Sequence, residues 1–216
     1  LIAGATGSGK STLIDGLLQT MLHQPPDQVK YIILDRKFTT LRPYAQAPHS
    51  MRHARSLDEM IQTLHDTIQL MNTRFNYMEN HDPDFSHVYL IIDELADLMT
   101  TRKRQATPLL QELGQLARES KIHIIAATQC PLASVIPTPI KVNFSAMLGL
   151  HTRSAQDSRN IIGAKGCELL PMYGRGVYVR PGEAPVKVSI PMVDDADMQR
   201  ILTHWKHNTT PRRVSA

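Results

Sequence analysis

The sequence predicts an α/β fold in which helices flank a mainly parallel central sheet. Short apolar, β-branched runs alternate with longer stretches in which apolar residues recur every three or four positions. This alternation is typical of a parallel sheet that helices cover on both faces. The chain has 216 residues, 42% of them hydrophobic and 20% charged, which is ordinary for a globular protein with one substantial core.

The strands and helices are predicted in chain order from these two patterns. Leu1, Ile2 and Ala3 read as the end of a buried strand, and a helical stripe follows over residues 13–21. A stripe over residues 57–78 predicts a long amphipathic helix, and a second stripe over residues 109–117 predicts another helix. The remaining candidate strands of the parallel sheet are residues 29–34, 88–92, 123–127 and 146–150.

The last quarter of the chain predicts a hairpin and a helix. Residues 176–179 and 186–190 are expected to pair around the turn signal Pro181-Gly182. Asp194 or Asp195 is expected to cap a last helix that runs through Trp205. We therefore predict one domain over residues 1–206 and a disordered polar tail over residues 207–216.

Composition excludes several kinds of protein. Cys130 and Cys167 lie too far apart for a disulfide framework or a metal motif, and no carboxylate or cysteine set joins His49 and His53 as a zinc site. Without a long apolar run or a signal peptide, this segment is expected to lie in the cytoplasm and make no membrane contact. Because it opens inside a strand without an initiator Met, we expect a piece of a longer protein. Whether that protein has a membrane anchor upstream is left open. The net charge of +4 is compatible with an anionic partner.

Residues 4–11 read GATGSGKS and fit the phosphate-binding pattern G-x-x-x-x-G-K-[ST] at every position. The strand before them and the helical stripe after them supply the context that this pattern requires. The glycines allow backbone N–H groups to turn around phosphates, Lys10 reaches the β and γ oxygens, and the Ser11 hydroxyl ligates Mg²⁺. The sequence therefore predicts a nucleoside triphosphate site made by Gly4, Ala5, Thr6, Gly7, Ser8, Gly9, Lys10, Ser11 and Thr12.

Polar residues follow two other predicted strands. Asp93 and Glu94 come directly after residues 88–92, and Gln129 follows residues 123–127 with one residue between. Because the carboxyl ends of parallel strands meet at one edge of a sheet, Gln129 is expected beside Asp93. We assign Asp93 to the Mg²⁺ shell and Glu94 to the base that polarises the attacking water, and Gln129 is expected to contact the γ-phosphate or that water.

These motifs resemble the motor domain of the FtsK/SpoIIIE family of DNA translocases, within the HerA-FtsK group of RecA-like ATPases. Residues 93–99 (DELADLM) are similar to the family's D-E-[FL]-A-D-L-M segment. Residues 121–123 and 127–129 resemble parts of its G-I-H-x-x-x-A-T-Q-R-P stretch, and Asp157-Ser158-Arg159 matches its D-S-R. The resemblance extends from Leu1 to Trp205.

The resemblance implies a RecA-like P-loop NTPase fold, ATP and Mg²⁺ as ligands, and a homo-hexameric ring with nucleotide at the subunit interfaces. Arg118 falls where the family carries an arginine that acts on a neighbour's γ-phosphate. A surface arginine paired with Glu112 or Glu119 is the alternative for this residue.

The resemblance also implies double-stranded DNA in the pore of the ring. Lys141 and Arg159 match family positions that touch the phosphate backbone. Two positions that are basic in the family are not basic in this chain. They are Cys130, directly after Gln129, and Ala155, shortly before the D-S-R segment, for which Arg153 is a candidate substitute. The basic run of residues 102–104 is interpreted as a solvated loop rather than as another DNA surface, and the Asp35/Lys37 pair as local structure.

An ATP-driven double-stranded DNA translocase is thus the first interpretation. A conjugative coupling protein or a secretion-system ATPase is the alternative within the same superfamily, and composition does not separate these. A nucleotide-gated scaffold with weak hydrolysis is an alternative of another class. Glu94, Gln129 and Arg118 argue against the scaffold, because a switch would not need the whole hydrolytic set.

Overall fold

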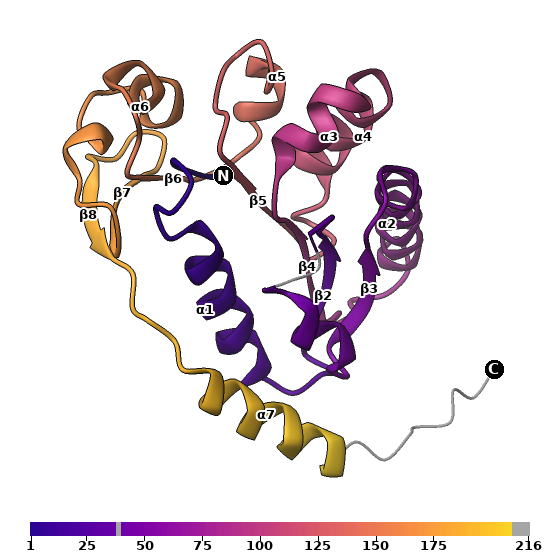
Figure 1. Cartoon of the computed structure of the whole chain (residues 1–216). Helices are drawn as coiled ribbons and strands as arrows, with labels where there is room; N and C mark the ends of the chain where they lie inside the picture. Colours follow the sequence, from indigo (N-terminus) through magenta and orange to yellow (C-terminus); the bar gives the residue numbers. More distant parts are fainter. Residues whose placement is uncertain (38–39, 209–216) are drawn as a thin grey trace.

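A computed structural model describes residues 1–37 and 40–208, and within these residues eight strands form one sheet in the order β3-β2-β4-β5-β1-β6-β7-β8 (Figure 1). The first six strands of this order are parallel, whereas β7 and β8 pair antiparallel at one end. The predicted α/β class with a mainly parallel sheet is therefore confirmed. The strands are β1 (Ile2–Ala3), β2 (Val29–Leu34), β3 (Ser50–Ala54), β4 (His87–Ile92), β5 (Ile122–Thr128), β6 (Met147–Leu150), β7 (Arg175–Val179) and β8 (Val186–Ser189).

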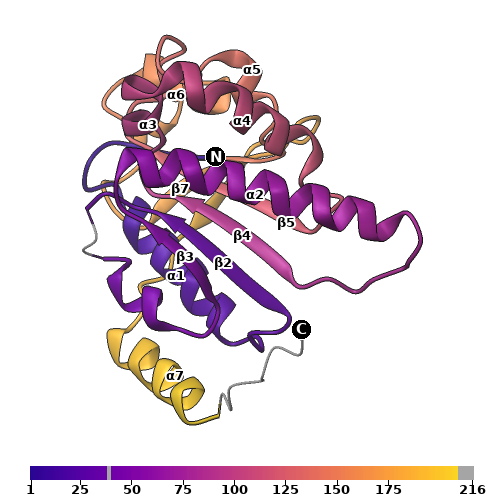
Figure 2. The same ribbon diagram turned by 90° about the vertical axis from the view of Figure 1, so that its right-hand side faces the viewer.

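Helices cover both faces of the sheet (Figures 1 and 2). On one face α2, α3 and α4 pack against the sheet, and on the other α1, η1 and α7 do so. No helix in the described part of the chain is long and apolar enough to cross a membrane. The helices are α1 (Lys10–Leu22), α2 (Leu57–Met78), α3 (Leu95–Thr101), α4 (Lys103–Leu116), α5 (Thr138–Lys141), α6 (Ala155–Ile162) and α7 (Asp195–Asn208), with the short 3₁₀ helices η1 (Arg42–Gln46) and η2 (Cys167–Leu169).

The two cores follow from the alternation of side chains along the central strands. On β4, Val88, Leu90 and Ile92 point into the core under α2, α3 and α4, whereas Ile91 points into the core under α1. Side chains of a strand alternate between faces, so a strand buried on both faces is apolar throughout. The helix α7 closes the second core, where Met198 and Leu202 are buried and the Trp205 indole donates a hydrogen bond to the Leu22 carbonyl over 2.7 Å.

The predicted elements agree with the structure within about one residue at most strand ends, as expected for a buried parallel sheet. The hairpin of β7 and β8 and the last helix are also present. Other expectations were incomplete or wrong, and the helices α3, α5 and α6 were not predicted. The edge strand β3 was not predicted, and Lys103 and Arg104 form the first turn of α4 rather than a solvated loop. Of the predicted tail, residues 209–216 lie outside the described residues.

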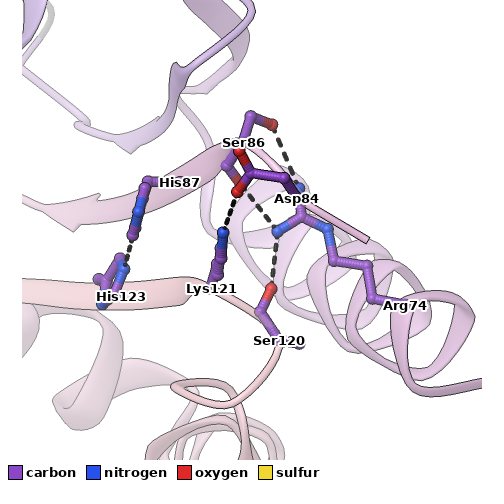
Figure 3. A network of polar contacts seen from close by, with 7 residues as sticks. All are labelled: Arg74, Asp84, Ser86, His87, Ser120, Lys121 and His123. Carbon is purple, nitrogen blue, oxygen red and sulfur yellow. Dashed lines mark hydrogen bonds and ion pairs between the residues drawn. The ribbon is translucent and has the colours of Figure 1, made fainter. Parts of the chain in front are cut away.

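A polar network ties α2 to the amino ends of β4 and β5 (Figure 3). The buried Arg74 guanidinium on α2 donates to the carbonyls of Ser86 at 3.0 Å and Ser120 at 2.7 Å. Nearby, a ring nitrogen of His87 lies 2.9 Å from one of His123. These contacts lie at the edge of the sheet where β4 and β5 start, opposite to the edge at which the phosphate-binding loop of residues 4–11 begins.

We predict that Arg74→Met lowers the free energy of unfolding by about 2–4 kcal/mol, since two carbonyls lose their charged donor in a buried site. Urea denaturation measures this change. Arg52→Ala is the matched control, because Arg52 pairs with Asp66 at 3.1 Å on the surface and should cost less than about 1 kcal/mol. Equal losses in the two variants would contradict the structural role of Arg74.

Candidate functional site

The register of the parallel strands brings the predicted motifs to one edge of the sheet. Ala3 on β1 lies opposite Thr128 on β5, and Ile92 on β4 lies opposite Ala126. The next residue of β1, Gly4, donates its N–H to the Thr128 carbonyl over 3.3 Å. The phosphate-binding loop, the acidic pair and Gln129 therefore all leave the sheet at its carboxyl edge, where ligands of open α/β sheets bind.

The conformation of the loop over residues 4–11 explains its glycines. Gly7 and Gly9 have positive φ angles of 78° and 97°, which residues with a Cβ rarely adopt. A Cβ on Gly4 would lie 2.5 Å from the Ser8 hydroxyl oxygen and 2.8 Å from Leu150 Cβ. The loop thus forms a backbone cradle at the start of α1, and its geometry fits a phosphate chain.

The Lys10 side chain folds back onto the phosphate-binding loop. Its ammonium group donates to the carbonyls of Gly4 at 2.7 Å and Ala5 at 2.9 Å, and the side chain is buried. Burial lowers the pKa of Lys10 from 10.5 to about 8, although the carboxylates of Glu94 and Asp93 act in the opposite direction. Phosphate oxygens would take the place of the two carbonyls as acceptors for this ammonium group.

Asp93 lies among other acidic groups. Burial raises its pKa, and the carboxylates of Asp35 and Glu94 raise it further. Asp35 is itself buried and accepts a hydrogen bond from the Lys37 N–H over 2.8 Å, in accord with the predicted local role of that pair. This excess of negative charge suits a divalent cation.

The protein groups alone do not form a complete cation site. No group of three or more His, Cys, Asp or Glu side chains in the described ranges could hold a metal ion. The Ser11 side chain is exposed at the start of α1, on the phosphate loop. Asp93 and Ser11 therefore fit Mg²⁺ only if phosphate oxygens and water supply its other ligands, as is usual for this ion.

Glu94 lies at the centre of a hydrogen-bond chain. Its carboxylate accepts from the Thr128 hydroxyl at 2.8 Å and from the Gln129 N–H at 3.0 Å, and it also accepts from the Ala96 N–H at the start of α3. The Gln129 amide oxygen accepts from the Thr6 hydroxyl of the phosphate loop over 2.7 Å. Gln129 thus joins Glu94, the residue directly after Asp93, to the phosphate loop.

Arg153 lies at this same site. It lines a cavity of about 330 Å³ together with Gly4, Ala5 and Gln129, and its charge acts on Lys10. Arg153 reaches this position because β6 neighbours β1, so that the loop after β6 lies against the phosphate loop. The Ala5 N–H donates to the His151 carbonyl of that loop over 2.8 Å. From the sequence we assigned Arg153 to DNA and did not predict its place beside the phosphate loop. The bond of Thr128 to Glu94 was not predicted either.

The other predicted basic residues lie apart from the phosphate loop. The Lys141 ammonium group donates to the Pro131 and Asn160 carbonyls, so that it ties the segment after β5 to α6, and burial lowers its pKa. Arg159 is exposed on α6 and bonds to Gln156. DNA contact by Lys141 and Arg159 stays a prediction, and the internal bonds of Lys141 favour a structural role.

Arg118 is exposed in the turn between α4 and β5, at the amino end of β5. The seven residues of β5 separate this end of the strand from the site by about 23 Å. The structure therefore keeps Arg118 away from the phosphate loop of its own chain. Its predicted action on a neighbouring subunit stays a prediction.

Comparison with known proteins identifies the family of this chain. Residues 1–85 match the model of the FtsK/SpoIIIE family. A DNA translocase FtsK of Staphylococcus epidermidis is 31% identical over 229 residues, which cover 94% of this chain and 29% of the relative. The chain thus spans less than a third of the length of the curated relatives it matches.

Solved structures share the fold. The cytoplasmic domain of the Type VII secretion ATPase EccC of Thermomonospora curvata has a TM-score of 0.80 at 22% identity, over 94% of this chain and 28% of that one. The pCW3 conjugation coupling protein TcpA, solved with ATPγS, has a TM-score of 0.79 at 20% identity, over 94% of this chain and 64% of that one.

The lowered pKa of Lys10 predicts proton uptake when ATP binds at alkaline pH. With a pKa of about 8, Lys10 is mostly neutral at pH 9 and mostly charged at pH 7, and a polyanion favours the charged form. The complex with ATP should therefore take up about one proton as it forms at pH 9 and only about a tenth of a proton at pH 7. Calorimetry in buffers of different ionisation enthalpy measures this number.

Lys10→Arg is the matched control, because its guanidinium stays charged at both pH values. This variant should show no difference in proton uptake between them. Equal uptake by the parent at pH 7 and pH 9 would contradict the lowered pKa.

Proposed function

Because this chain carries an FtsK/SpoIIIE-family domain, we propose that it hydrolyses ATP to move double-stranded DNA through a homo-hexameric ring. The observation that carries the proposal is the meeting of the phosphate loop, Asp93, Glu94 and Gln129 at one sheet edge. ATP is an intracellular ligand, so we also propose that the domain works in the cytoplasm.

In the proposed reaction, the backbone N–H groups of the loop and the Lys10 ammonium group bind the phosphates. Asp93 and Ser11 would hold Mg²⁺, which supplies charge neutralisation on the β and γ oxygens when bound. Glu94 takes a proton from the attacking water, and Gln129 orients that water. The bond from Thr6 to Gln129 would have to open when the γ-phosphate arrives.

We assign Arg118 to the site of a neighbouring subunit. An exposed guanidinium at the edge opposite to its own phosphate loop suits this role, because it can stabilise transition-state charge only across an interface. Each complete site then contains residues of two subunits, so turnover requires assembly.

For DNA, we propose that Arg159 contacts the phosphate backbone, as expected for a motor that moves along any sequence. The exposed position of Arg159 on α6 supports this assignment. Lys141 and Arg153 stay candidates, although the first bonds internally and the second lies beside the phosphate loop.

A second candidate is transport of a polypeptide by a secretion-system ATPase. The replacement of two basic family positions by Cys130 and Ala155, together with the internal bonds of Lys141, favours a weaker DNA path. A conjugative coupling protein would share the DNA substrate of the first proposal. A nucleotide-gated scaffold with weak hydrolysis is disfavoured by the bonds that hold Glu94 and Gln129 beside the loop.

We predict that linear duplex DNA raises the ATP turnover of this chain several-fold. Turnover is measured with duplex DNA, with an unfolded polypeptide and with neither. In all three conditions Glu94→Gln should lower the rate by about 10²–10⁴-fold, because the general base is lost. Stimulation by polypeptide alone would select the secretion candidate, and parental turnover by Glu94→Gln would refute the assigned base.

Within the same assay, Arg159→Ala should reduce DNA stimulation but leave the basal rate unchanged. Its DNA affinity should also depend less on salt, by about one unit in the slope of log K against log salt. Arg200→Ala is the control, because Arg200 is an exposed arginine on α7, on the other face of the sheet. An unchanged slope for Arg159→Ala would remove this residue from the DNA path.

The assignment of Arg118 predicts complementation between two inactive variants. Arg118→Ala should lose turnover by about a thousandfold or more, because the trans-acting cation is absent. Lys10→Ala should lose turnover through its own phosphate loop but still offer Arg118 to a neighbour. Mixed rings would then contain some complete sites, and ATPase activity should reappear on mixing. If Arg118→Ala alone hydrolysed ATP at the parental rate, the assignment of Arg118 would be wrong.

A further inference from the structure

The loop between η2 and β7 lies against the phosphate-binding loop. A Cβ placed on Gly7 would lie 3.6 Å from Met172 Cε and 3.9 Å from the Tyr173 hydroxyl oxygen. A Cβ on Gly9 would lie 4.0 Å from the Gly174 nitrogen. Three consecutive residues of one loop therefore border the two glycines of the cradle that have positive φ angles.

The side chains of this loop are large and exposed. Tyr173 is 71% exposed and Met172 is 41% exposed. Among the described residues, Tyr173 makes no hydrogen bond and no contact with another ring. An exposed aromatic ring beside a site for a charged ligand requires an explanation, because the core gains nothing from it.

The order of the strands fixes the direction in which a bound triphosphate would lie. Glu94 and Gln129, which act at the γ-phosphate, follow β4 and β5 on one side of β1. The loop of Tyr173 leads into β7, which lies beyond β6 on the other side of β1. A triphosphate with its γ-phosphate towards Gln129 therefore directs its sugar and base towards the side of Tyr173.

We propose that Tyr173 forms a stacking surface for the base of the bound nucleotide, with Met172 holding the loop of Tyr173 against Gly7. This inference rests on the proposed function, since it concerns the same ATP site. A tyrosine ring presents a flat apolar face, and stacking on it accepts any nucleobase because every base has a π-face. The residue would thus add affinity for the nucleoside part without contact with the phosphates.

The test compares ATP with inorganic tripolyphosphate, which carries the same phosphate chain without a nucleoside. Dissociation constants of both, with Mg²⁺, are measured by calorimetry on the Glu94→Gln background so that ATP is not consumed. Tyr173→Ala should weaken ATP binding by about tenfold and change tripolyphosphate binding less than about twofold. Tyr173→Phe keeps the ring and should bind ATP like the parent.

Tyr77→Ala serves as a matched control, because Tyr77 is an exposed tyrosine at the end of α2, 49% exposed and remote from the site. It should leave both constants unchanged. Unchanged ATP binding by Tyr173→Ala would overturn the inference. An equal loss for ATP and tripolyphosphate would also overturn it, because Tyr173 would then only support the phosphate loop.

The failure of this inference can be told apart from the failure of the proposed function. If the Glu94→Gln parent binds neither ATP nor tripolyphosphate, the proposed function fails and the inference fails with it. If this parent binds ATP and only the comparison of Tyr173 variants is negative, the inference fails alone.

Discussion

The strand β1 lies between β5 and β6, and its two residues pair in parallel with both neighbours. The hydrogen bonds from Gly4 to Thr128 and from Ala5 to His151 continue this pairing into the phosphate loop. Because β1 is held on both sides, the loop after it is fixed against Gln129 on one side and Arg153 on the other. The contacts of the candidate site all depend on this arrangement.

The charges around Lys10 and Asp93 support the proposed binding of a nucleotide. Lys10 is held by two carbonyls of its own loop, while Asp93 and Glu94 lie close enough to raise its pKa against the effect of burial. A polyanion can replace the carbonyls, and a cation can relieve the repulsion among Asp93, Glu94 and Asp35. This balance of charges is what the proposed joint binding of a nucleotide and a divalent ion requires.

Much of this arrangement could be predicted from the sequence, because the central strands and the motifs carry local signals. The run over residues 29–34 is apolar apart from Lys30 and coincides with β2. The edge strand β3 (Ser50–Ala54) was not predicted, since it contains Arg52 and His53 and has no apolar pattern. Lys103 and Arg104 were misassigned because a basic run looks like a loop when the apolar stripe of α4 begins only at Ala106.

Tertiary contacts of the site were harder to predict. The positions of Arg153 and Tyr173 beside the phosphate loop depend on which strands neighbour β1, and no local pattern reports that order. The internal bonds of Lys141 were equally hidden, because a lysine that binds backbone carbonyls has the same sequence signature as one that binds DNA.

A crystal structure of this chain with Mg²⁺ and a non-hydrolysable ATP analogue is the most direct test of the central claim, that the carboxyl edge around β1 is the nucleotide site. We expect the Lys10 ammonium group to leave the carbonyls of Gly4 and Ala5 for phosphate oxygens, with the γ-phosphate facing Gln129. A nucleotide bound elsewhere, or a Lys10 that keeps both carbonyls while the nucleotide is bound, would contradict it.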